Sequence, residues 1–212
     1  MRRLPVYILI DTSGSMYGEP IEAVKNGLSI MLSTLTSDPY ALETAYLSII
    51  SFNETAQQIL PLTEITAVTV PNVEASGCTA LGEALSLVSD CIEKEVEKGS
   101  NSAKGDWKPL IFIMTDGEPT DDINIGLPKF KSLKTGVVVA CAAGNGANTG
   151  ILKQITENVV SLSAADSESI KSFFKWVSAS VSVSSVKVDN HGEISNNLDE
   201  LPPPPDEINV VL

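Results

Sequence analysis

The stretch that decides the fold lies near the N-terminus and reads LPVYILIDTSGS, residues 4–15. Its first seven residues form a near-continuous apolar run that is rich in β-branched side chains, as in strands buried on both faces of a parallel sheet. The run stops at Asp11, and Ser13 and Ser15 follow at alternate positions. The stretch therefore predicts a buried strand that leads into a polar loop at its carboxyl end.

Similar apolar runs recur along the chain, at residues 46–50, 110–114 and 137–143. Between the runs lie segments whose apolar residues share one helical face, around residues 21–35, 81–96 and 170–181. This alternation predicts an α/β fold with a doubly wound, mostly parallel sheet of six strands and helices on both faces. Strands near 43–52 and 57–62 are joined by a short turn, so we expect one antiparallel edge strand. Between the last two apolar runs, Leu127-Pro128 predicts that any helix there follows the proline.

The composition changes near residue 184. Residues 186–212 contain six acidic residues and one lysine, and the four prolines Pro202–Pro205 favour polyproline II. We therefore expect a domain of residues 1–183 and an acidic, proline-containing tail of residues 184–212. Because residues 208–212 are apolar again, we expect the tail to dock on this domain or on a partner; the alternative is a disordered tail.

Charge and residue usage exclude several classes of function. The formal net charge of −13 argues against binding to nucleic acid or to an anionic membrane surface, and the apolar runs are too short to span a bilayer. His191 is the one histidine, which excludes a histidine-rich zinc site and leaves little room for Ser-His-Asp or Cys-His catalysis. We therefore expect a protein that is not an enzyme.

The cysteines and the N-terminus predict a cytoplasmic location. Cys78, Cys91 and Cys141 are odd in number and widely spaced, which favours reduced thiols. Two arginines precede the first apolar run, as in a signal peptide, but the run is short and no small-residue cleavage site follows it. We interpret the run as a strand.

Polar side chains follow two strands that should be neighbours. Asp11, Ser13 and Ser15 can point to one side of their loop, and Asp116 follows the strand of residues 110–114. Strand ends at the topological switch point of a doubly wound sheet form the usual ligand crevice. Thr79, which precedes the helix near 81–96, can bring another hydroxyl to it. Carboxylates with neutral hydroxyls favour Mg²⁺, or Mn²⁺, over zinc.

These motifs resemble those of the von Willebrand factor A (VWA) family. The resemblance rests on Asp-x-Ser-x-Ser after the first strand, Gly-x-Thr before a helix and Thr-Asp-Gly after the fourth strand, and it covers roughly residues 4–181. It implies a Rossmann-like VWA fold and a metal-ion-dependent adhesion site (MIDAS). Carried over residue by residue, the metal set is Asp11, Ser13, Ser15, Thr79 and Asp116.

A narrower resemblance concerns the TerY-type proteins of bacterial tellurite-resistance gene clusters. It rests on MRRLPV at residues 1–6, GDWKP at residues 105–109 and TDGEPTD at residues 115–121. The resemblance implies a cytoplasmic adaptor in a stress response, which works beside a protein kinase and a PP2C-type phosphatase.

The expected mechanism is binding without turnover. A magnesium ion held by few direct protein ligands stays electrophilic, so an Asp or Glu of a partner protein could complete its coordination. One alternative is a VWA scaffold with a vestigial metal site that binds its partner through the proline-rich tail. A minor alternative is a haloacid dehalogenase-like phosphatase that uses Asp11, although Ser13 stands where that chemistry needs a second acid.

Overall fold

A seven-stranded sheet forms the centre of the computed structural model, which describes residues 2–100, 104–190 and 192–211. Met1, His191 and Leu212 lie outside the described residues. The strands run in the spatial order β3-β2-β1-β4-β5-β6-β7. Their bounds are β1 Leu4–Asp11, β2 Ala45–Phe52, β3 Ala56–Glu64, β4 Leu110–Thr115, β5 Val138–Ala143, β6 Val159–Leu162 and β7 Ile208–Val210.

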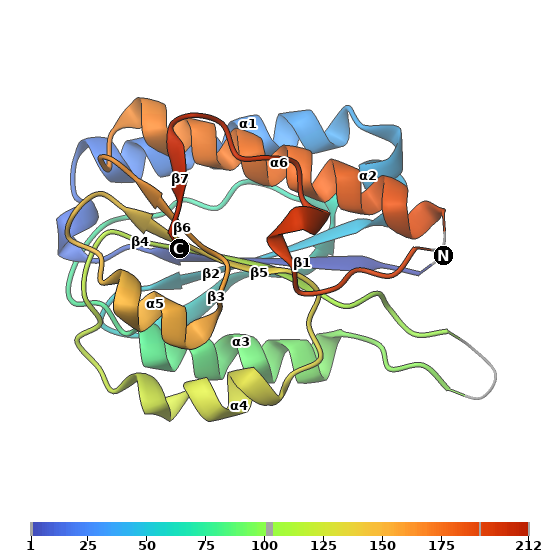
Figure 1. Cartoon of the computed structure of the whole chain (residues 1–212), viewed down its shortest axis with the longest axis horizontal. Coiled ribbons are helices and arrows are strands. Elements are labelled where there is room, and N and C mark those ends of the chain that lie inside the picture. Colours follow the sequence, from blue (N-terminus) through green and yellow to red (C-terminus); the bar gives the residue numbers. More distant parts are fainter. Residues whose placement is uncertain (1, 101–103, 191, 212) are drawn as a thin grey trace.

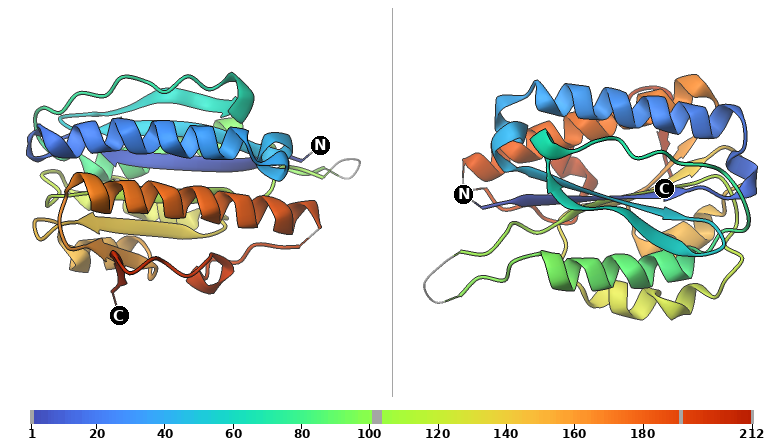
Figure 2. Two further views of the ribbon diagram at one scale, coloured as in Figure 1. Left: turned by 90° about the horizontal axis from the view of Figure 1, so that it is seen from above. Right: turned by 180° about the vertical axis from the view of Figure 1, so that it is seen from behind.

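Helices cover both faces of the sheet (Figures 1 and 2). One layer contains α1 (Glu19–Thr36), α2 (Pro39–Thr44) and α6 (Ser167–Asp189). The opposite layer contains α3 (Leu81–Glu95), α4 (Leu127–Ser132) and α5 (Thr149–Ile155). Short 3₁₀ segments occur at Gly14–Met16, Ile65–Ala67, Ile123–Ile125 and Leu198–Glu200. Among the described residues, no helix is both long and apolar enough to cross a membrane.

The first strand is buried along its whole length because it lies in the interior of the sheet and helices cover both of its faces. It pairs in parallel with β2 on one side and with β4 on the other. Side chains alternate along it: Val6 and Ile8 join the core under α1 and α6, whereas Tyr7 and Leu9 join the core under α3. The predicted doubly wound fold is confirmed, and the carboxyl ends of β1 and β4 lie side by side where the strand order reverses.

The sheet has one strand more than the six expected. The added strand is β7, which pairs antiparallel with β6, so both edges of the sheet are antiparallel. Three residues are too few for a strand to show the alternation by which sequence patterns are recognised.

The segment after residue 184 packs on the same body. Helix α6 continues through residue 184 to Asp189, because Val181 and Val188 keep its apolar face buried. Beyond the helix, the indole Nε1 of Trp176 donates a hydrogen bond to the carbonyl of Pro202 at 2.8 Å, and Leu201 is buried.

The expectation for the helix near Pro128 was wrong by two residues. Helix α4 begins at Leu127 rather than after the proline, because a proline in the first turn lacks only an N–H that would have no helical partner.

Candidate metal centre

Asp11 is a fully buried carboxylate at the carboxyl end of β1. Its Oδ1 accepts a hydrogen bond from the backbone N–H of Ser13 at 2.8 Å, and its Oδ2 accepts one from the Thr115 hydroxyl at 2.5 Å. Neither Asp11 nor Asp116 takes part in any ion pair formed by the described residues. Burial raises the pKa of Asp11 above its usual value, against the hydrogen bonds from Ser13 and Thr115, which lower it.

A chain of hydroxyls joins the first loop to Asp116. The Oγ atoms of Ser13 and Ser15 lie 3.0 Å apart, and the Ser15 hydroxyl donates to Asp116 Oδ1 at 2.7 Å. Burial also raises the pKa of Asp116, although the Ser15 hydrogen bond acts in the opposite direction. Four of the five predicted residues therefore form one group at the carboxyl ends of β1 and β4.

Thr79 reaches the same space from the loop before α3. A Cβ atom placed on Gly117 would lie 3.7 Å from the Thr79 hydroxyl oxygen and 3.8 Å from that of Ser15. The absence of a side chain at Gly117 thus leaves both hydroxyls facing a common space. The Thr79 loop is also fixed to the segment after β4, because Thr79 N–H donates to the Thr120 hydroxyl and Thr120 N–H donates to the Thr79 carbonyl.

Backbone hydrogen bonds join the loop after β1 to the loop before α3. Gly14 N–H donates to the carbonyl of Gly77 at 3.0 Å, and Ser76 N–H donates to the carbonyl of Thr12 at 2.9 Å. Gly77 has a φ of +72°, in the left-handed region that favours glycine. The loops are therefore fixed to one another by backbone hydrogen bonds, so their side chains are positioned without a ligand.

The residues present fit a hard divalent cation. Two partly or fully buried carboxylates and three hydroxyls supply oxygen only, and no cationic side chain of the described residues forms an ion pair with either carboxylate. Among the described residues, no group of three or more His, Cys, Asp or Glu side chains could hold a metal. Any metal here would therefore depend on hydroxyl ligands as well as on Asp11 and Asp116.

The roles of three supporting residues were not predicted from the sequence. Thr115 positions Asp11 through its hydroxyl, Gly117 leaves the space open, and Thr120 fixes the Thr79 loop. Thr115 and Gly117 were visible as neighbours of Asp116, but their roles depend on contacts across strands. Thr120 lies 41 positions from its partner, and no local pattern links the two.

Residues 6–176 match the profile of the von Willebrand factor type A domain. The chain belongs to the VWA family. VWA domains are a metal-dependent protein-interaction fold, in which a divalent cation binds at the MIDAS, and they are typically interaction modules rather than enzymes.

Curated relatives share the domain only in part. The chain is 30% identical over 125 residues to human inter-alpha-trypsin inhibitor heavy chain H6, which covers 54% of this chain and 9% of that protein. It is 32% identical over 124 residues to an uncharacterized protein of Synechocystis sp., which covers 55% of this chain and 26% of the other. The chain thus spans a small part of these relatives.

Solved structures support the same fold. A von Willebrand factor type A protein from Catenulispora acidiphila superposes with a TM-score of 0.65 at 18% identity, covering 85% of this chain and 43% of the other. Proximal thread matrix protein 1 from the mussel byssus, solved with a zinc-occupied MIDAS motif, gives a TM-score of 0.59 at 19% identity. That match covers 84% of this chain and 48% of the mussel protein.

Proposed function

We propose that this chain binds a partner protein through a divalent cation at the carboxyl ends of β1 and β4. One observation carries the proposal: Asp11 and Asp116 are joined by hydroxyls in adjoining loops and have no positive partner among the described residues. Uncompensated buried carboxylates are costly, and a bound cation offsets that cost. The proposed ligand set is Asp11, Ser13, Ser15, Thr79 and Asp116.

Mg²⁺ is the metal that the donor set favours, and Mn²⁺ suits the same oxygens. The zinc in the mussel protein's MIDAS makes Zn²⁺ the natural competitor to test. When bound, the ion supplies an electrophilic position that an Asp or Glu of the partner can occupy. Thr115 orients Asp11, Ser15 orients Asp116, and the glycine at 117 keeps access open.

The partners and process rest on the motifs shared with TerY-type proteins. GDWKP at residues 105–109 and TDGEPTD at residues 115–121 support a cytoplasmic adaptor in a bacterial tellurite-resistance or stress-response system. A protein kinase and a PP2C-type phosphatase from the same gene cluster are the proposed partners. The VWA domain of residues 1–183 would carry the metal, and the segment of residues 184–212 would support it.

The packing of the tail bears on the main alternative. Leu201 and Ile208 are buried, and Trp176 binds the Pro202 carbonyl, so much of the proline-rich segment is engaged by its own domain. A partner that recognised polyproline II would have to use the more open Pro203. We therefore propose that the partner binds at the metal site, and a substitution at Pro203 tests the alternative that it binds the tail.

The test compares metal binding with partner binding. Calorimetric titration with Mg²⁺, Mn²⁺ and Zn²⁺ should show one site in the wild type, none in Asp11→Ala or Asp116→Ala, and an unchanged site in Asp206→Ala, an exposed acid on the tail. Affinity purification of the proposed kinase and phosphatase should succeed with Mg²⁺ and fail with EDTA or with Asp11→Ala. Capture that survives EDTA but is lost in Pro203→Ala would assign binding to the tail instead.

A further inference from the structure

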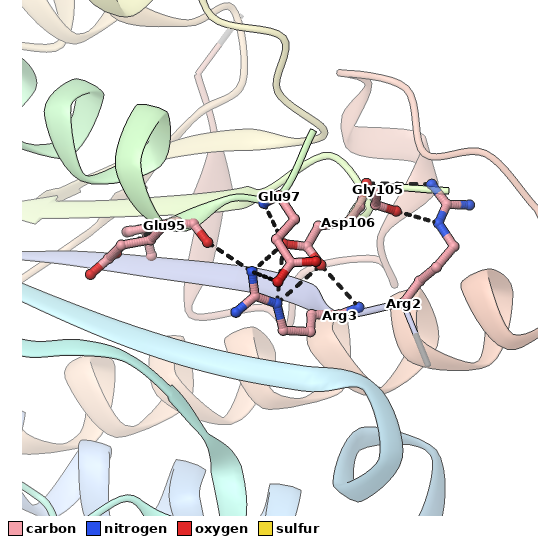
Figure 3. Close-up of polar contacts among 7 residues, drawn as sticks. Arg2, Arg3, Glu95, Glu97, Gly105 and Asp106 are labelled. Atoms are coloured by element: carbon pink, nitrogen blue, oxygen red, sulfur yellow. Dashed lines mark hydrogen bonds and ion pairs between the residues drawn. The ribbon is translucent and has the colours of Figure 1, made fainter. Parts of the chain in front are cut away.

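A second region with an organised set of charges lies at the opposite end of the sheet, where the strands begin. Figure 3 shows its centre, the carboxylate of Asp106, whose side chain is 3% exposed. Arg3 donates to it through Nε at 3.0 Å and Nη2 at 2.6 Å, and the backbone N–H of Glu97 donates at 2.8 Å. These contacts fix the segment that enters β4.

Arg2, which precedes Arg3 in the sequence, contacts the residues on either side of Asp106. Its Nε donates to the Gly105 carbonyl at 2.6 Å, and its guanidinium lies 3.5 Å from the centroid of the Trp107 ring. Unlike Arg3, Arg2 forms none of the ion pairs found among the described residues. Trp107 is thus held by a stacked cation that has no ion-pair partner in the part of the chain that the structure describes.

Beside Trp107 lies a groove between the ends of α3 and α4. Two adjoining hollows of about 570 and 580 Å³ form it, and both are lined by Lys108, Leu133 and Lys134. Its apolar lining comes from residues of α3, the β4 entry and the turn after α4, namely Ile92, Val96, Trp107, Pro109 and Leu133. The groove therefore offers an apolar floor large enough for side chains of a ligand.

The acidic residues of the groove already have cationic partners. Asp106 pairs with Arg3 at 2.6 Å, Glu97 makes a longer contact of 3.7 Å with the same guanidinium, and Glu93 pairs with Lys129 at 3.0 Å. The lysines behave differently, because none of those lining the groove forms an ion pair among the described residues. They are Lys98, Lys108, Lys131 and Lys134. The groove is thus lined by four lysines and three acids, and Arg3 and Lys129 lie beside those acids, so the lining as described carries an excess of positive charge on a chain whose net charge is −13.

We propose that this groove binds an acidic peptide segment of a partner protein, with an apolar residue of that segment on the Trp107–Leu133 floor. Charge complementarity supplies the argument for the acidic residues, and the floor supplies the argument for the apolar anchor. A nucleic acid is a poor occupant, because the chain outside the groove carries more acidic than basic residues and would repel a long polyanion.

The groove is independent of the proposed metal centre. Strand β4 separates the two, and its six residues span ~20 Å at about 3.3 Å per residue. Figure 1 shows the separation, with the loops before α1 and α3 at one end and the segment between α3 and β4 at the other. Two partners can therefore bind at once, one at each end of the sheet.

The test uses a short fluorescein-labelled peptide that alternates Glu and Leu, followed by fluorescence anisotropy in EDTA. Wild-type protein should bind it, and Lys108→Glu/Lys134→Glu should weaken binding by about tenfold. The matched control, Lys171→Glu/Lys175→Glu on α6, changes the net charge equally on the opposite face and should change affinity by less than about twofold. Far-ultraviolet circular dichroism checks that both variants fold.

Two comparison ligands separate this proposal from its competitors. A Glu and Ser peptide and inorganic phosphate lack the apolar anchor, so each should bind at least about tenfold more weakly. In spectra of ¹⁵N-labelled protein, the Glu and Leu peptide should shift the Trp107 indole signal. If both lysine variants lost affinity for the Glu and Leu peptide equally, the attraction would be non-specific. If phosphate bound as tightly as this peptide, the groove would be a small-anion site. If the wild type did not bind the peptide, the groove would not be a peptide site.

Discussion

Two deeply buried carboxylates at opposite ends of the sheet have opposite surroundings. Asp106 is held by the Arg3 guanidinium, whereas the hydrogen bonds to Asp11 from the described residues come from a hydroxyl and a backbone N–H. The hydrogen bond to Asp106 raises the pKa of Arg3, and burial raises the pKa of Asp11. An acid with its own cation stabilises the fold, while an acid without one is suited to take its cation from solution.

The largest effect is expected where the internal pair is broken. Arg3→Met leaves Asp106 buried without its cation, which should lower the free energy of unfolding by about 3 kcal/mol, since removing one member of a buried ion pair strands the other. Urea denaturation measures the loss. The control is Glu97→Gln, because the Glu97 side chain is 76% exposed and its pairing with Arg3 should contribute less than about 0.5 kcal/mol. Equal losses in the two variants would mean that burial does not decide the effect.

The next effect tests whether the carboxyl end takes a cation. Mg²⁺ at about 100 times its dissociation constant should stabilise the wild type by about 2.7 kcal/mol, since it binds the folded state alone. Thermal unfolding with Mg²⁺ and with EDTA measures this shift. Asp11→Asn should abolish it, whereas Glu97→Gln should retain it in full. A shift that persists in Asp11→Asn would place the cation elsewhere.

The smallest effect is the change in the free energy of unfolding when Asp11 is replaced by Asn without metal. Its sign should be opposite to that of the same replacement at Asp106. Because burial raises the folded-state pKa of Asp11, stability is lost as the pH rises from the unfolded towards the folded pKa, and above the unfolded pKa this carboxyl group lowers stability. Asp11→Asn in EDTA should therefore stabilise by about 1 kcal/mol. Asp106→Asn should destabilise, because it removes the pairing with Arg3. Urea denaturation at neutral pH decides between them.

The central part of the fold followed from sequence because its signals are local. Buried parallel strands such as β1 and β4 are continuous apolar runs, and the helices between them show one apolar face. The antiparallel hairpin β2–β3 was visible from its short turn. Strand β7 was not, since it has three residues and its pairing is with β6, a strand distant in sequence.

The candidate site divides in the same way. Asp11, Ser13 and Ser15 lie in one short loop, so their grouping followed from spacing alone, and Asp116 followed from the strand order. The hydrogen bond from Thr115 to Asp11 and the open space at Gly117 could be recognised only in the three-dimensional structure. So did the groove at the other end, since it combines α3, the β4 entry and the turn after α4.

Strand β7 also limits how this protein can associate with others. Open sheet edges invite pairing with strands of another chain, which leads to aggregation. One edge here ends in a three-residue strand next to the exposed acids Asp206 and Glu207, and the other, β3, pairs with shifts of register. Both edges are poor templates for a foreign strand. We therefore expect partners to be recruited by loops and grooves at the ends of the strands, with the sheet itself closed to growth.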